Sequence, residues 1–129
     1  MKLHKTFAVL LAGISPLVGI AQASQPPTDA IVNIAELDID PAQLDAFKDA
    51  VIEGMNASVR LEPGVYAIYA VAHKDDPTKL MFFEIYASKQ AQEAHRNSPH
   101  FLKFREVTKD MVRSRRFIET DTVHLAAKP

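Results

Sequence analysis

The sequence predicts a small α+β domain of the ferredoxin-like class, an antiparallel sheet with helices on one face. Segments with strand and helix patterns follow one another in the order strand, helix, strand, strand, helix, strand, which is the order of the split βαβ arrangement. The two middle strands are separated by a short turn, so they should pair as an antiparallel hairpin. Both are apolar on both faces, which indicates that neither face of the sheet is fully open to water.

The first strand and the first helix are expected in the N-terminal half of the domain. AIVNIAELDI, residues 30–39, has a strand pattern. DPAQ, residues 40–43, resembles a capping box, with aspartate at the N-cap, proline at the first helical position and glutamine at the third. Glu62-Pro63-Gly64 should end the helix after about Arg60. One face of this helix carries Leu44, Phe47, Val51 and Met55.

The hairpin and the second helical region follow. Residues 65–74 and 79–87 are expected to be strands on either side of the turn DDPT. Ser88 can cap a second helix, and Ser98-Pro99 begins a further helical segment. The last strand is expected at residues 115–125, with a loose tail at 126–129. The residues of the last helix expected to face inward are Phe101, Phe104, Val107 and Met111.

The apolar hairpin also predicts a homodimer. A half-solvated antiparallel strand should alternate apolar and polar residues, but VYAIYAVA and LMFFEIYA do not. Helices would cover one face of the sheet. The simplest cover for the other face is the sheet of a second copy, related by a two-fold axis.

Residues 1–23 have the pattern of a secretory signal peptide. Lys2 and Lys5 precede the apolar run TFAVLLAGISPLVGI, and small residues at 21–23 predict cleavage after Ala23. The run is shorter than the roughly 20 apolar residues that a bilayer needs, and it contains Pro16, which argues against a membrane anchor. We therefore expect a flexible lead-in at 24–29, a domain at 30–125 and a periplasmic or secreted protein.

Composition limits the partners and the chemistry. The chain has no cysteine and therefore no disulfide. Without residues 1–23 it would carry a formal net charge of −3, which argues against nucleic acid as a partner. No glycine-rich nucleotide motif or nucleophile elbow is present, so dinucleotide and ATP have no support.

Glu84 is the first candidate for a functional group. It is the one charged residue between Leu80 and Ala87 in an apolar strand, and alternation places it on one face with Phe82 and Tyr86. A buried carboxylate needs a partner or a proton, so Glu84 should be paired, neutral or directed into a polar cavity. The alternative is a residue at a wet rim, paired with a helix.

His95 and His100 lie on either side of the Ser98-Pro99 break. His95 comes two helical turns after Ser88 and could approach Glu84, giving an imidazole–carboxylate pair suited to general-base catalysis. His100 should shape the rim of the pocket. Packing or capping is the alternative for both. A metal is not expected, because an i, i+5 spacing across a proline should not bring both rings to one face, and no third ligand has a recognisable spacing.

Aromatic and amide side chains complete the expected pocket. Strand aromatics usually belong to a core, whereas a tyrosine hydroxyl or a buried amide needs a polar partner that a substrate can provide. The expected substrate-binding residues are Tyr86, His100, Asn33, Tyr69, Phe82 and Phe104.

Residues 61–104 resemble the antibiotic biosynthesis monooxygenase domain. The matching pieces are Glu62-Pro63-Gly64, Asp76-Pro77, Glu84-Ile85-Tyr86 and His95 followed by Ser98-Pro99-His100-Phe101, with Ala35-Glu36-Leu37 and Asp40-Pro41 upstream. The resemblance implies a dimeric α+β barrel that oxygenates phenolic or quinol-type rings without metal or flavin. Some relatives isomerise a small phosphorylated diketone. Others degrade haem with a cleft tryptophan, but this chain has no tryptophan and His95 occupies that position, which argues against haem.

Together these features predict a cofactor-independent monooxygenase acting on a quinol or phenol with O₂. His95 would be the base and Glu84 its orienting partner. The alternatives are an isomerase of a small enolisable ketone and a non-catalytic periplasmic binding dimer. Dependence of turnover on oxygen would separate the two enzymes, and binding without turnover would favour the third.

Overall fold

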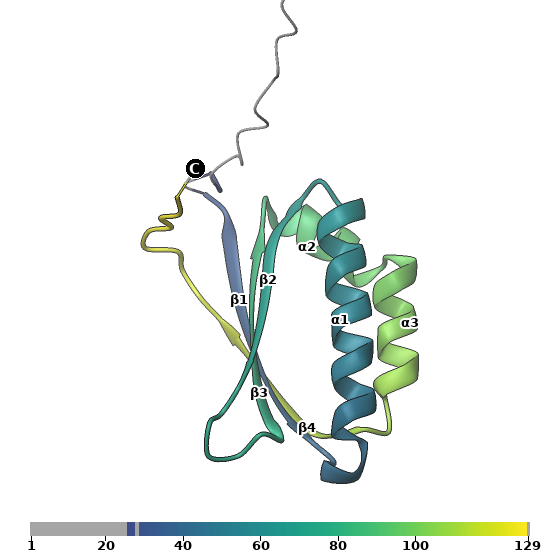
Figure 1. The fold of residues 1–129 in the computed structure, drawn as a ribbon. Coiled ribbons are helices and arrows are strands. Elements are labelled where there is room, and N and C mark those ends of the chain that lie inside the picture. The colour runs from purple at the N-terminus through teal and green to yellow at the C-terminus, as the bar shows by residue number, and fades with distance from the viewer. Residues whose placement is uncertain (1–25, 28, 129) are drawn as a thin grey trace, which may run out of the picture.

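Four antiparallel strands and the helices on one side of them make up the structure, a computed structural model that describes residues 26–27 and 29–128 (Figure 1). The predicted signal peptide and its cleavage site lie outside the described residues. In the described part of the chain, no helix combines the length and the apolar character that a membrane span requires. The elements are β1 (Ile31–Ile39), a 3-10 turn (Pro41–Gln43), α1 (Leu44–Leu61), β2 (Val65–Ala72), β3 (Lys79–Tyr86), α2 (Lys89–Arg96), α3 (Pro99–Thr108) and β4 (Val112–Glu119).

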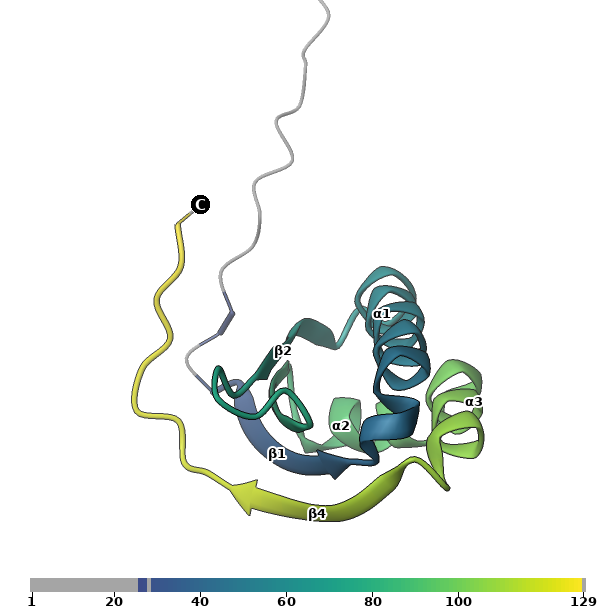
Figure 2. The same cartoon turned by 60° about the horizontal axis from the view of Figure 1, so that its bottom comes forward.

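The sheet has the strand order β2-β3-β1-β4, and all of its neighbouring strands are antiparallel. The helices α1 and α3 lie side by side over one face, with α2 near one end of the sheet (Figures 1 and 2). The predicted fold class and order of elements are therefore confirmed.

The start of α1 shows how the DPAQ segment acts. The Asp40 carboxylate accepts a hydrogen bond from the Ala42 amide at 3.1 Å, and the Gln43 side chain donates to the same carboxylate at 3.3 Å. The Asp40 amide instead donates to the Met111 carbonyl. The predicted cap is thus present, but it closes a 3-10 turn ahead of α1, and the glutamine binds the Asp40 side chain rather than its backbone.

The main core lies between the sheet and α1. Phe47 and Val51 of α1 are buried against strand residues, and Leu44 and Met55 pack beside them, as predicted. The prediction for Val107 is wrong, because its side chain is 48% exposed. Thr108 takes the inward position, one helical turn after Phe104, and donates to the Phe104 carbonyl at 2.8 Å. Met111 packs against the core from beyond the end of α3.

The C-terminal segment corrects the predicted last strand. β4 begins at Val112 and ends at Glu119, instead of spanning residues 115–125. The Thr120 hydroxyl then donates to the carbonyl of Val32 in β1, and the Thr122 hydroxyl donates to the carbonyl of Ala30 just before β1, both at 2.6 Å. These side-chain bonds replace a regular strand ladder. The segment leaves β4 on the side of the sheet away from the helices (Figure 2).

The outer face of the sheet is covered only in part. Leu125 packs against a cluster of Ala30, Val32 and Ile85, so the chain itself covers one end of this face. Tyr69 and Val71 stay 60% and 59% exposed. The homodimer expected from this face stays a prediction.

Candidate active site

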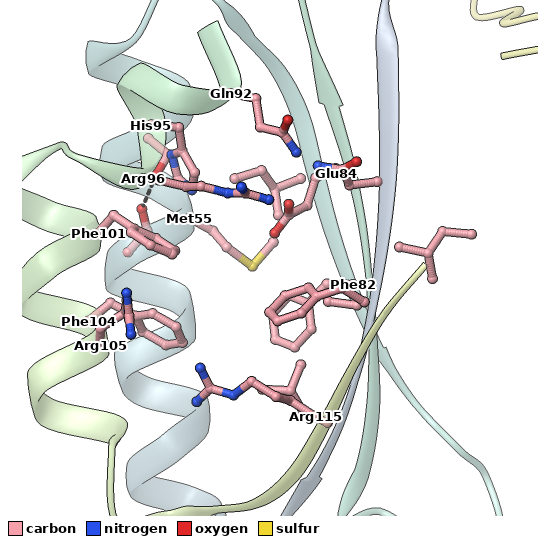
Figure 3. A pocket seen from close by; sticks show the side chains of 18 of the residues that line it. Met55, Phe82, Glu84, Gln92, His95, Arg96, Phe101, Phe104, Arg105 and Arg115 are labelled. Atoms are coloured by element: carbon pink, nitrogen blue, oxygen red, sulfur yellow. Dashed lines mark hydrogen bonds between the residues drawn. The ribbon is translucent and has the colours of Figure 1, made fainter. Parts of the chain in front are cut away.

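A cavity of about 520 Å³ lies between the sheet and the helices, within the roughly 300–1,000 Å³ usual for small-molecule sites. Its middle is lined by apolar and aromatic side chains, with polar and charged groups towards its ends (Figure 3). The side chains in its middle are those of Met55, Phe82, Phe101 and Phe104.

The position of α2 depends on two local features. The Ser88 hydroxyl accepts a hydrogen bond from the Ala91 amide at 3.1 Å and caps the helix. Gly64 lies so close to α2 that a Cβ on it would be 2.5 Å from the Cβ of Ala91. The close approach turns one face of α2 inward, and His95 is 3% exposed. His95 therefore reaches the cavity wall.

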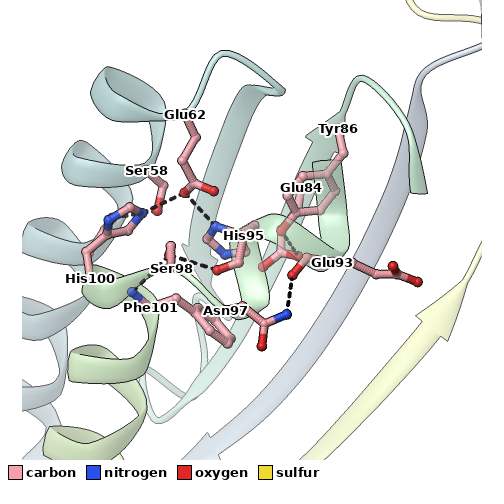
Figure 4. Close-up of polar contacts among 11 residues, drawn as sticks. Ser58, Glu62, Glu84, Tyr86, Glu93, His95, Asn97, Ser98, His100 and Phe101 are labelled. Atoms are coloured by element: carbon pink, nitrogen blue, oxygen red, sulfur yellow. Dashed lines mark hydrogen bonds and ion pairs between the residues drawn. The ribbon is translucent and has the colours of Figure 1, made fainter. Parts of the chain in front are cut away.

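The carboxylate of Glu62 binds both histidines. Its Oε2 lies 2.9 Å from Nδ1 of His95 and 2.6 Å from Nε2 of His100 (Figure 4). Glu62 follows the last residue of α1, while the histidines come from α2 and α3. The carboxylate partner of His95 is therefore Glu62, and the predicted pairing with Glu84 is wrong. The end of α1 reaches α2, whereas Glu84 is engaged within its own strand.

The ionisation of Glu62 determines which nitrogen of the His95 ring carries a hydrogen. Burial raises the pKa of Glu62, but hydrogen bonds from His95 and His100 outweigh it and hold this pKa below its usual value. An ionised carboxylate only accepts, so Nδ1 of His95 carries the hydrogen of this bond, and in the uncharged form of the ring Nε2 has the lone pair. Nε2 of His95 has no hydrogen-bond partner in the protein. Among the described residues, every fully buried side-chain nitrogen or oxygen does have a partner, so Nε2 must have some exposed surface. Nε2 is thus accessible from the cavity.

Glu84 and Tyr86 form a second polar pair on the cavity wall. The Tyr86 hydroxyl donates to Oε2 of Glu84 at 2.8 Å. Burial, together with the charge of Glu84 and this hydrogen bond, raises the pKa of Tyr86 far above its usual value. Tyr86 therefore stays protonated as a fixed donor. Its ring centroid lies 5.5 Å from that of His95, so the two polar pairs are neighbours.

A family model described as antibiotic biosynthesis monooxygenase matches residues 30–107 of the chain. The chain belongs to the antibiotic biosynthesis monooxygenase family. Membership supports a general monooxygenase role. Comparison with curated proteins gave no match.

Solved structures of other family members share this fold. A protein from Bacteroides thetaiotaomicron, provisionally assigned as an antibiotic biosynthesis monooxygenase, is 36% identical, with a TM-score of 0.74 over 78% of this chain and 96% of that one. A protein from Nitrosomonas europaea with the same provisional assignment is 25% identical, with a TM-score of 0.69 over 73% of this chain and 99% of that one.

Most of the predicted site residues of this antibiotic biosynthesis monooxygenase family member line one cavity. They are His95, Glu84, Tyr86, Asn33, Phe82 and Phe104. Tyr69 and His100 do not line it. Tyr69 pairs with Phe83 in the sheet and points to the outer face with it. His100 instead contacts the Glu62 carboxylate through Nε2.

Four charged residues were missed by the sequence analysis. Glu62 was taken only as part of a helix stop, although the Glu-Pro-Gly segment matched the family. Three arginines also line the cavity. The sequence offered a signal for one of them, because Arg105 comes four residues after Phe101 and so lies on the same face of α3. The arginines are Arg96, Arg105 and Arg115.

Glu62, His95 and His100 are also the group of described residues that could hold a metal ion. Their ligand atoms all lie within 4.8 Å of one another, and a carboxylate with two imidazoles suits a divalent transition metal. The expectation that the rings would diverge is wrong, because their centroids lie 6.4 Å apart and both contact Glu62. The absence of a metal stays a prediction.

Proposed function

We propose that this family member is a cofactor-independent monooxygenase acting on a quinol or phenolic substrate. The observation that supports the proposal best is the Glu62–His95 pair, which leaves Nε2 open to a largely aromatic cavity. Aromatic walls suit a flat ring, and a base with an orienting carboxylate suits removal of a hydroxyl proton.

The first step moves one proton. Nε2 of His95 takes the hydroxyl proton of the substrate, and the Glu62 carboxylate stabilises the imidazolium that results. The guanidinium of Arg96 extends across the cavity towards Glu84 (Figure 3) and provides positive charge near the new phenolate. Gln92 also lines the cavity and offers a further hydrogen bond to the ring oxygen, while the hydroxyl hydrogen of Tyr86 is already engaged by Glu84.

The second step uses the substrate as its own reductant. The phenolate passes one electron to O₂, and the two radicals combine to form a carbon–oxygen bond. The imidazolium returns its proton to the peroxide. The O–O bond then breaks as the ring carbon loses its proton, which gives a C=O group and one water. The substrate loses four electrons in total and O₂ gains four, so no other reductant is needed.

The apolar walls protect these intermediates. Phe82, Phe101 and Phe104 surround the middle of the cavity. They exclude water from the radical pair and leave room for O₂, which is itself apolar.

Oxygen uptake with ¹⁸O₂ tests the proposal. Naphthols, hydroquinones and anthrone would be supplied with and without oxygen, with enzyme-free samples to correct for autoxidation. We expect one O₂ consumed and one ¹⁸O atom incorporated for each substrate molecule, and no turnover without oxygen. Equal turnover under anaerobic conditions would instead identify the isomerase, and binding of these compounds without any turnover would identify a binding protein.

We also propose that the active form is a homodimer joined through the outer sheet face. The exposed Tyr69 and Val71 lie on this face and support the proposal. Light scattering should give about twice the mass of one chain. Tyr69→Asp should lower the measured mass to that of a single chain. Ile52→Asp on α1, where the side chain is equally exposed at 59%, should leave the dimer intact. A wild-type monomer would contradict the proposal.

We further propose export to the periplasm or beyond, on the basis of the pattern in residues 1–23. N-terminal sequencing of the protein recovered from a periplasmic extract should begin at Ser24. Retention of Met1 in a cytosolic fraction would contradict this proposal.

A further inference from the structure

We propose that the substrate is an aromatic acid, whose anionic group binds Arg105 and Arg115 at the end of the cavity opposite His95. This inference rests on the proposed function and narrows it to one class of substrate. It assigns a specificity role to two arginines that the base chemistry does not use.

The two guanidinium groups come from different walls of the same cavity. Arg105 belongs to α3 and Arg115 to β4, and both line the cavity. In Figure 3 Arg105 lies beside Phe104 and Arg115 lies below Phe82, both in the part of the cavity away from His95. Two positive charges that line one cavity repel each other, and an anion bound between them would relieve that repulsion.

Neither arginine has a partner among the described residues. No hydrogen bond or ion pair involves either of them, although the arginines on both sides of Arg115 are paired: Arg113 with Asp40 at 3.3 Å and Arg116 with Glu36 at 2.6 Å. The acidic residues Glu106 and Glu53, on α3 and α1, are engaged by Lys109 and Lys103. These two carboxylates are therefore committed to lysines.

The acidic residues of the cavity lie at its other end. Glu84 and Glu119 are both paired in register with Asn33 of β1, while Arg115 is paired with Leu37. An offset of four strand residues corresponds to about 13 Å along the sheet. Arg96 faces Glu84 at the acidic end. The positive charge of Arg105 and Arg115 thus has no counterpart within the cavity.

These positions describe an elongated ligand. Its hydroxyl would meet His95 and Tyr86, its rings would lie between the phenylalanines, and its acidic group would reach the two arginines. The planar guanidinium fork matches a carboxylate with two parallel hydrogen bonds. A fused two-ring acid with its hydroxyl and carboxylate at opposite ends has this shape.

Two probes that differ only in the acidic group provide the test. They are 6-hydroxy-2-naphthoate and 2-naphthol, and their dissociation constants would be measured by calorimetry. We expect the acid to bind about tenfold more tightly than the neutral naphthol, because both arginines are exposed and water weakens their attraction. Added salt should weaken binding of the acid alone.

Substitution of the arginines assigns this preference to its residues. In the double variant Arg105→Gln and Arg115→Gln, the two probes should bind equally, and the affinity for 2-naphthol should be that of the wild type. Arg116→Gln is the matched control, since this arginine belongs to the same strand but pairs with Glu36, which does not line the cavity. It should keep the tenfold preference.

Two results would overturn the inference: wild-type protein that binds 2-naphthol as tightly as the acid, or a preference that persists in the double variant. Circular dichroism would establish that the variants are folded. Oxygen uptake separates the inference from the proposed function. If the acid binds preferentially but no phenol ever consumes O₂, the anion site stands and the monooxygenase proposal fails. If both probes are oxidised equally well and bind equally tightly, the monooxygenase proposal stands and the anion site fails.

Discussion

Oε2 of Glu62 lies 2.9 Å from Nδ1 of His95 and also binds His100, so one carboxylate joins the end of α1 to α2 and α3. This contact determines which nitrogen of His95 faces the cavity. The proposed base is therefore oriented by a residue 33 positions earlier in the chain, and not by a neighbour on the facing strand.

Replacement of His95 should remove the base. We expect His95→Ala to lower kcat by roughly 10²- to 10⁴-fold, the usual loss for general-base catalysis, while a phenolic ligand still binds. His73→Ala is the control, because His73 is exposed beyond the end of β2. Steady-state oxygen uptake would measure both variants. Full turnover by His95→Ala would show that another group takes the proton.

The two carboxylates near the base should differ in importance. Glu62→Gln should lower kcat more than Glu84→Gln, because Glu62 contacts the imidazole directly while Glu84 contacts Tyr86. The sequence had assigned the orienting role to Glu84 alone. Glu84→Gln should act mainly on KM, through the orientation of Tyr86. A larger loss of kcat for Glu84→Gln would return Glu84 to the role of direct partner.

Patterns that are local in the chain predicted most of the fold. Ser88 caps its helix as expected, with a hydrogen bond from the Ala91 amide, and a new helix begins at Ser98-Pro99, where the Phe101 amide donates to Ser98. The alternation along β3 correctly placed Phe82, Glu84 and Tyr86 on one wall. Capping and alternation depend on residues a few positions apart, so a single sequence contains the information.

The contacts that define the site join residues that lie far apart in the sequence. Glu62 reaches His95 only because α1 ends where α2 passes, and nothing in the Glu-Pro-Gly segment encodes that distance. His100 likewise contacts Glu62, 38 positions earlier, and does not line the cavity. The early end of β4 has a similar origin, since the hydroxyls of Thr120 and Thr122 bind the carbonyls of Val32 and Ala30 in place of a backbone ladder.

Gly64 should be needed for the close approach of α2. In Gly64→Ala the new methyl group would overlap the Cβ of Ala91, at 2.5 Å, so α2 must shift. We expect a loss of about 1–3 kcal/mol in unfolding free energy by urea denaturation, together with reduced kcat, because His95 moves with the helix. Gly54→Ala is the control. Its Cβ would lie 3.6 Å from that of Phe104, an ordinary contact, and alanine should stabilise the interior of α1. Equal stability of the two variants would contradict this account.

A metal ion at the three-residue group should inhibit rather than activate. If a metal displaced the Glu62 contact and bound Nδ1 of His95, the ring proton would move to Nε2 and the base would be lost. We expect chelators to leave oxygen uptake unchanged and added Zn²⁺ to lower it. Glu62→Gln should bind Zn²⁺ more weakly in calorimetry. A rate that falls with chelator and returns with a divalent metal would contradict a metal-free mechanism.

Acid should weaken the fold partly through Glu62. Its pKa lies below the ordinary 4.5 because hydrogen bonds from the two histidines outweigh burial, which acts in the other direction. A carboxyl group whose pKa is lower in the folded state contributes stability that is fully present above the unfolded pKa. That contribution disappears as the pH falls through the lower, folded pKa.

Between pH 5 and pH 3 the wild type should therefore lose more unfolding free energy than Glu62→Gln, which has no carboxyl to protonate. Urea denaturation at each pH would measure this difference, and the shifted carboxyls of Asp40 and Asp76 are common to both proteins. Parallel losses in the two proteins would show that the histidines do not stabilise the Glu62 carboxylate.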